Sequence, residues 1–177
     1  MDATTPSEPV PPLWLRLVVG RRPRRTLVRL VVLVLASLVL FFVLKFLLLP
    51  VRVTGISMAP NYRDGHVNFI NKLAYRSHPP ARGDVVGIRF LGEQVLLLKR
   101  VVGLPGERIV IRQGIIEING EPLAEPYLKL APAPWNEPEY RLTADEYFVV
   151  GDNRQMPGNQ HTHGVADRNL IIGKALF

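Results

Sequence analysis

The segment VTGISMAP, Val53–Pro60, separates two parts of the chain that differ in composition. An apolar stretch long enough to cross a membrane precedes it, and strand-like patterns of apolar residues follow it. The segment contains Ser57, and the other serine of residues 51–177 is Ser77. A serine hydroxyl attacks well only after a base takes its proton, and no side chain in this segment can act as that base. A base must therefore come from a distant part of the sequence.

The apolar stretch before this segment has the length of a membrane span. Over Leu30–Leu44 the only polar residue is Ser37, and the apolar run continues past Lys45 to Leu49. About 20 apolar residues cross a bilayer, and the long stem of a lysine can carry its amine to the interface. A buried helix of a soluble domain is the alternative, but such a helix seldom lacks a polar face over this length. We predict a transmembrane signal anchor over residues 26–50.

Positive charge lies before this run rather than after it. One arginine, Arg52, follows the run closely, whereas six precede it: Arg16, Arg21, Arg22, Arg24, Arg25 and Arg29. The positive-inside rule then predicts a single-pass protein of the cytoplasmic membrane, with residues 1–25 as a basic cytoplasmic tail and residues 51–177 outside. The polar, proline-rich Met1–Pro12 part of the tail is expected to be disordered. A cleaved signal peptide is the competing interpretation, but no A-x-A-like site follows the run.

Composition excludes several classes of function. The net charge is +7, but most of it belongs to the first 50 residues, so residues 51–177 are nearly balanced. A nucleic-acid-binding domain needs a basic face, and we therefore predict no nucleic-acid partner. The chain has no cysteine, which excludes disulfides, a cysteine nucleophile and thiolate metal sites.

After residue 50 the patterns are those of strands. Apolar residues alternate or run continuously in short segments: VRVTG, HVNFINKLAY, DVVGIRF, QVLLLKRVVG, ERIVIRQGIIEING and EYFVV. Turns are expected at Gln113-Gly114 and Asn119-Gly120. Residues 122–138 contain several prolines and are expected to form a covering loop or a peripheral lobe. A short closing helix or strand is expected near the end, at Asp167–Ala175. The predicted fold is mainly β: an antiparallel β-sheet catalytic domain, residues 51–177, behind one N-terminal transmembrane helix.

Lys99 is the best candidate for the missing base. It follows the apolar run Val95–Leu98 and precedes Arg100 and two valines, so the strand is expected to be central. Burial disfavours an ammonium ion, and a fall of about two units would bring a lysine pKa near working pH. The alternative is a lysine that reaches solvent at a strand end. Arg100 is expected on the opposite face of the strand, paired with a carboxylate.

The surroundings of the two serines favour Ser57. Ser77 lies beside His78 in a loop, and adjacent residues seldom face one another productively. Ser57 follows Gly55 where a strand gives way to a turn, which leaves backbone N–H groups that can bind an oxyanion. The alternative is a serine that only stabilises a turn.

Several motifs, in this order, resemble those of the bacterial type I signal peptidases (leader peptidases, peptidase S26). They are GISMAP around Ser57, RGDVV at Arg82–Val86, KRVVGLPGE at Lys99–Glu107 and GDNR at Gly151–Arg154. The resemblance implies a membrane-bound serine endopeptidase that cleaves signal peptides from exported preproteins after small residues. It also implies a Ser/Lys dyad that works through an acyl-enzyme, with Ser57 as nucleophile and Lys99 as general base.

The resemblance assigns structural roles near the site. The Ser57 N–H would donate to the oxyanion, while Gly55 stands where some members of the family carry a second, hydroxyl donor. Asp152 and Arg154 match the family's structural loop, and Asp152 would be the partner of Arg100.

The resemblance also implies where the substrate binds. An extended peptide would pair with the strand that ends at Lys99. Met58, Leu97 and Leu98 would then line shallow pockets for the small residues before the cleavage point.

The chain departs from the family after GDNR. Pro157, Asn159 and His161 stand where members of the family commonly have a serine, an aspartate and an arginine. Two alternatives therefore remain open: a catalytically inactive or weak membrane-tethered peptide-binding module, and a Ser/Lys protease with one dedicated substrate. His161 and His163 lack an apparent third ligand, so we predict no metal and no cofactor. The partners that we expect are signal peptides and the lipid bilayer, and we expect a monomer.

Overall fold

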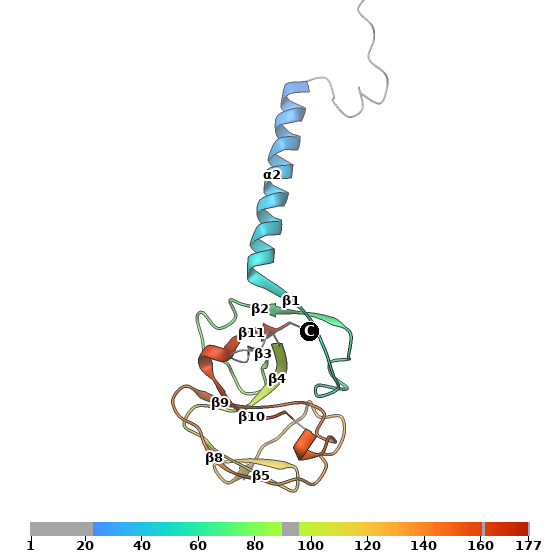
Figure 1. Ribbon diagram of the computed structural model, residues 1–177. Coiled ribbons are helices and arrows are strands. Elements are labelled where there is room, and N and C mark those ends of the chain that lie inside the picture. Colours follow the sequence, from blue (N-terminus) through green and yellow to red (C-terminus); the bar gives the residue numbers. More distant parts are fainter. Residues whose placement is uncertain (1–22, 90–95, 161, 177) are drawn as a thin grey trace, which may run out of the picture. The chain divides into compact units, whose positions relative to one another are not determined.

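The computed structural model of the chain describes residues 23–89, 96–160 and 162–176 (Figure 1). The predicted cytoplasmic tail therefore lies almost entirely outside the described residues, as does His161. The chain divides into two compact units, Met1–Phe46 and Leu47–Phe177.

Helix α2, Pro23–Leu47, belongs to the first unit except for its last residue, and its Arg24–Leu47 part is long and apolar enough to span a bilayer. Leucine, valine and phenylalanine side chains are exposed on all sides of this helix, as expected for a segment surrounded by lipid. The helix ends three residues before the predicted boundary at Pro50. Proline has no N–H and disfavours a helical residue before it, and the Leu48–Arg52 segment instead forms strand β1.

In the described part of the second unit the strands form two antiparallel sheets (Figure 1). The larger sheet has the order β1-β2-β11-β3-β4-β9-β10. Its strands after β1 are β2 (Val67–Asn71), β3 (Val85–Arg89), β4 (Leu96–Gly103), β9 (Glu146–Val150), β10 (Gly164–Asp167) and β11 (Ile171–Ala175). The smaller sheet, in the order β7-β6-β5-β8, comprises β5 (Arg108–Arg112), β6 (Ile115–Ile118), β7 (Glu121–Pro122) and β8 (Glu137–Arg141). The mainly β, antiparallel prediction is confirmed.

Both predicted tight turns are present. Gln113 and Gly114 join β5 to β6 with φ values of 50° and 79°, and Asn119 and Gly120 join β6 to β7 with 53° and 94°. Positive φ at both central residues is the geometry that twists a two-residue hairpin correctly. A Cβ atom at Gly114 would also lie 2.3 Å from the Ala133 carbonyl oxygen, so this position excludes any side chain.

Three buried apolar clusters hold the unit together. One fills the space between the sheets around Phe148, Ile109 and Val102. A second lies around Val86, Val101 and other residues of β3, β4 and β9. The third joins the turn after β1 to the sheet and contains Val53, Met58, Ile70, Val85, Leu98 and Ala175. Because the third cluster includes both Met58 and Leu98, it fixes the Ser57 turn against β4.

Two short 3-10 helices complete the described elements, Gly158–Gln160 (η1) and Arg168–Leu170 (η2). The closing segment Asp167–Ala175, which was predicted as a helix or a strand, combines η2 with strand β11. The predicted covering loop is largely irregular, with β7 at its start and β8 at its end.

Candidate active site

Strand β4 is central in the larger sheet, but one of its edges is only partly paired. Residues Leu96–Arg100 pair with β3 along the whole segment. On the other edge, β9 pairs with Arg100, Val101 and Gly103 and ends at Val150. Among the described strands, none pairs with this second edge of β4 over Leu96–Lys99. This edge therefore offers backbone hydrogen-bonding groups to an added strand.

Ser57 lies in a cavity that residues Leu96–Leu98 of β4 also line. It is partly exposed, and Gly55 and Met58 line the same cavity. The structure thus brings the predicted nucleophile together with all three residues predicted to bind substrate.

The backbone of the Ser57 turn is held on both sides. The Gly55 N–H donates to the Asp64 carboxylate at 2.8 Å, and Gly55 has a φ of +88° that favours glycine. The Tyr62 N–H donates to the Met58 carbonyl at 2.9 Å. Across the described part of the chain, no hydrogen bond uses the Ser57 N–H. That donor is therefore available to a bound group.

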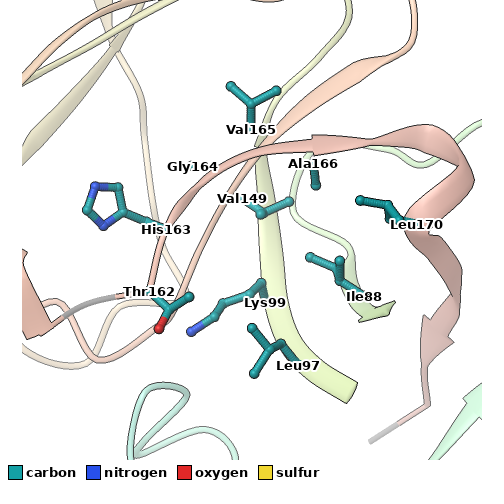
Figure 2. Close-up of a pocket in the computed structure, with 10 residues that line it drawn as sticks. All are labelled: Ile88, Leu97, Lys99, Val149, Thr162, His163, Gly164, Val165, Ala166 and Leu170. Atoms are coloured by element: carbon teal, nitrogen blue, oxygen red, sulfur yellow. The ribbon is translucent and has the colours of Figure 1, made fainter. Parts of the chain in front are cut away.

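Lys99 lies in a second cavity, which Leu97 also lines (Figure 2). The lysine is only 2% exposed and sits among aliphatic side chains, including Ile88, Val149 and Ala166. Burial lowers the pKa of Lys99 from 10.5 to about 8. Roughly a tenth of a group with this pKa is neutral at pH 7, and that neutral amine can accept a proton.

The Gly151–Arg154 loop is bound to β4 through a buried ion pair. The Arg100 Nε donates to Asp152 Oδ1 at 2.7 Å and its Nη2 donates to Oδ2 at 2.5 Å. The Arg100 side chain is 12% exposed and that of Asp152 is fully buried. Asn61 adds a third bond, from Nδ2 to Asp152 Oδ2 at 2.8 Å. This forked geometry fixes the loop beside Lys99, the residue that precedes Arg100.

Arg154 is a second fully buried charge of the same loop. Its guanidinium contacts the carboxylate of Glu125 with both terminal nitrogens, one of them at 3.1 Å. Its Nε donates to the Gly151 carbonyl at 2.8 Å, and its own carbonyl accepts from the Ala133 N–H at 2.9 Å. The proline-rich covering segment is thus attached to the loop through Glu125 and Ala133.

Several residues of this network were not predicted from the sequence. The Gly151–Arg154 loop is contacted by Glu125 and Asn61, and Asn153 belongs to it. The Tyr127 ring lies under the Arg100 guanidinium, 4.0 Å from its centroid. Glu125 and Tyr127 are in the proline-rich segment, whose sequence does not show which of its residues contact the loop. Asn153 could have been found, because it lies inside the GDNR motif.

His163, which follows this loop, contacts two other side chains. The His163 Nε2 lies 3.1 Å from a Glu137 carboxylate oxygen, and its ring packs on Trp135. Among the described residues there is no group of three His, Asp or Glu side chains suited to a metal ion. Pro157 and Asn159, two of the residues that depart from the family pattern, are exposed.

Comparison with known proteins connects this geometry to one family. The family model "Signal peptidase, peptidase S26" matches residues 24–177. The probable signal peptidase I-1 of Synechocystis sp. is 35% identical over 158 residues, which are 84% of this chain and 77% of that protein. Signal peptidase IB of Staphylococcus aureus is 28% identical over 159 residues, 80% of this chain and 83% of that protein.

A solved structure is also similar. The crystal structure of a signal peptidase I from Enterococcus faecalis V583 matches with a TM-score of 0.43 and 24% identity, over 54% of this chain and 95% of that chain. The family model covers most of the chain described above, including both sheets and the Ser57 turn. The chain therefore belongs to the signal peptidase family, peptidase S26.

Proposed function

We propose that this chain is a membrane-anchored serine endopeptidase that removes signal peptides from exported preproteins, with Ser57 as nucleophile and Lys99 as general base. As a member of its family it is a peptidase, and hence a hydrolase. The observation that carries the assignment of the base is the burial of Lys99, whose pKa is lowered to about 8. Lysine is otherwise almost fully protonated at neutral pH and cannot accept a proton.

The first half of the proposed reaction forms an acyl-enzyme. The neutral Lys99 amine takes the proton of the Ser57 hydroxyl as the oxygen attacks the peptide carbonyl carbon. The resulting oxyanion accepts a hydrogen bond from the Ser57 N–H, which makes no hydrogen bond within the described residues. Gly55 has no side chain and so adds no second hydroxyl donor. The Lys99 ammonium then gives its proton to the departing amine as the C–N bond breaks.

The second half regenerates the enzyme. Lys99, neutral again, takes a proton from a water molecule that attacks the ester carbonyl. The ester C–O bond breaks, and the Ser57 oxygen recovers a proton from the Lys99 ammonium. Both groups belong to one chain, so the proposed mechanism works in a monomer.

The substrate is proposed to bind as an added strand on the open edge of β4, Leu96–Lys99. The cavity lined by Ser57, Met58, Leu97 and Leu98 would then accept small side chains before the cleaved bond. Helix α2 would anchor the chain in the cytoplasmic membrane with its N-terminus inside. Signal peptides lie in the same bilayer, so an anchor raises the effective concentration of enzyme and substrate.

Preprotein cleavage by the full chain in detergent tests this proposal. Ser57→Ala and Lys99→Ala are each expected to lower the cleavage rate on the order of 10³-fold or more. The chain offers matched controls, Ser77→Ala and Lys72→Ala, which change an exposed serine and an exposed lysine and should cleave at the normal rate. Full activity in Ser57→Ala or Lys99→Ala would overturn the assignment. Peptide binding without cleavage by the unaltered chain would favour the inactive module.

A further inference from the structure

The cavity around Lys99 contains one hydroxyl that the proposed mechanism does not use. Most of the lining is aliphatic, and the polar side chains among its residues are those of Lys99, Thr162 and His163. In the view of Figure 2 the Lys99 amine nitrogen ends near the Thr162 side chain, on the same side of the cavity that both residues line. The His163 imidazole points away from the amine in the same view, and it contacts Glu137 at 3.1 Å.

The order of the strands brings Thr162 and Lys99 to the same end of β9. Gly164 is opposite Val149 at the start of the pairing of β10 with β9, and Thr162 lies two residues before it. Arg100 is opposite Val150, the last residue of β9, and Lys99 lies one residue beyond that pairing. Both side chains line the same cavity, at the end of β9 where neither residue is paired with that strand.

We propose that Thr162 is a positioning residue. Its hydroxyl oxygen accepts a hydrogen bond from an N–H of the Lys99 amine, and this bond turns the lone pair of the amine toward Ser57. This inference rests on the proposed function of Ser57 and Lys99. A neutral lysine amine has two N–H donors and one lone pair, and rotation about its last bond decides where the lone pair points. One fixed acceptor removes that freedom. Threonine suits this task because its branched Cβ restricts its own rotation.

The same hydroxyl offsets the departure of the chain from the family pattern. Proline at position 157 brings no hydroxyl, and its side chain is exposed. Thr162 lies five residues later, after η1 has brought the chain back beside β9. In the proposed arrangement the hydroxyl also accepts from the Lys99 ammonium, more strongly than from the neutral amine, because that bond is charge-assisted.

Two substitutions separate positioning from a structural role. Thr162→Val keeps the shape of the side chain and removes the hydroxyl, whereas Thr162→Ser keeps the hydroxyl. In preprotein cleavage by the full chain, Thr162→Val should lower kcat roughly tenfold with KM unchanged, as the loss of one positioning hydrogen bond predicts. Thr162→Ser should stay within about twofold of the unaltered chain. The control is Thr143→Val, which removes an exposed hydroxyl far along the chain from both cavities.

The pH profile gives a second readout. A hydroxyl that accepts from the ammonium raises the pKa of Lys99, so its removal should move the acid limb of kcat to lower pH while the plateau falls. The charged and titratable groups near Lys99 have other partners. His163 contacts Glu137, and Arg100, on the other face of β4, binds Asp152. A merely structural residue would lower kcat without moving the limb.

The possible results decide between the proposals. A Thr162→Val variant with normal kcat and an unmoved acid limb overturns the role of Thr162, and so does a Thr162→Ser variant as impaired as Thr162→Val. A Thr162→Ala variant tests the same prediction if the valine disturbs the loop. If Ser57→Ala or Lys99→Ala remains fully active, the proposed function itself fails. If both are inactive and Thr162→Val is normal, only this inference fails.

Discussion

The backbone N–H of Asn153 donates to the carbonyl oxygen of Ser57 at 2.9 Å. The Asn153 side chain adds a second bond, from Nδ2 to the Ile56 carbonyl at 3.1 Å. The GDNR loop therefore touches the Ser57 turn directly, in addition to its ion pair with Arg100. Two segments nearly 100 residues apart in sequence are held together by these bonds, and the position of the candidate nucleophile depends on both.

Asn153→Ala should lower cleavage of a preprotein about 2- to 10-fold, because it removes one hydrogen bond that fixes the turn and leaves the backbone bond in place. Steady-state kinetics of the full chain measure this. Asn159→Ala changes an exposed asparagine farther along the same loop and should have no effect. Equal rates for both variants would mean that the side chain of Asn153 does not position Ser57.

Removal of one partner of the Arg100–Asp152 pair should strongly destabilise the second unit. Asp152→Ala leaves a nearly buried guanidinium without its carboxylate, which typically costs about 3–5 kcal/mol. Urea unfolding of the full chain in detergent measures this cost. The double variant Arg100→Met with Asp152→Ala should lose less than the sum of the two single losses, because no charge is left uncompensated. Additive losses would show that the pair does not act as a unit.

Glu125→Gln should destabilise the fold, because it removes the charge that faces the fully buried Arg154 guanidinium. A matched control is Glu139→Gln. Glu139 pairs with Arg108 and Arg141 on the exposed surface of the smaller sheet, and such pairs are worth about 0–1 kcal/mol. Thermal unfolding of the full chain compares the two. A loss at Glu125 as small as that at Glu139 would contradict the structural role of the covering segment.

Local sequence patterns predicted the secondary structure well because the responsible forces are local. The apolar run fixed α2, and Gln113-Gly114 and Asn119-Gly120 fixed the hairpins of the smaller sheet, since few residues tolerate positive φ there. Helix α2 ends at Leu47, three residues before the end of the predicted anchor. Hydropathy does not distinguish the last residues of the helix from the apolar start of β1, whose pairing with β2 decides the matter.

Contacts between distant segments could not be predicted in the same way. Arg154 and Glu125 form an ion pair across 29 residues, and no periodic pattern marks either one. The shared cavity of Thr162 and Lys99 could not be predicted either, because only the assembled sheet brings the ends of β10 and β4 to the same end of β9. The burial of Lys99, in contrast, could be expected from the apolar run before it.

The lowered pKa of Lys99 also predicts how stability depends on pH. Below pH 8 the folded state must keep a buried ammonium, whereas the unfolded state holds its proton at no such cost. Between pH 8 and 10.5 the folded state has released the proton and the unfolded state has not, so stability rises with pH. Lys99→Met should therefore be more stable than the unaltered chain at pH 7, by on the order of 3 kcal/mol, and the difference should shrink as the pH approaches 10.5.

Urea unfolding of both chains at several pH values measures this difference. Comparison of the pair cancels the titration of other groups that the two chains share. A difference that stays constant from pH 7 to 10.5 would mean that Lys99 keeps an ordinary pKa in the folded state.

The most direct test of Lys99 as the base uses the absence of cysteine from the chain. Lys99→Cys introduces a single thiol, which 2-bromoethylamine converts into a lysine analogue with sulfur in place of one methylene group. Preprotein cleavage is measured before and after this alkylation, with Lys72→Cys treated alike as the control. If Lys99 is the base, Lys99→Cys is inactive and alkylation restores cleavage, with the acid limb at lower pH because sulfur withdraws electrons from the amine. Cleavage by Lys99→Cys at the normal rate without alkylation would contradict the assignment of Lys99 as the base.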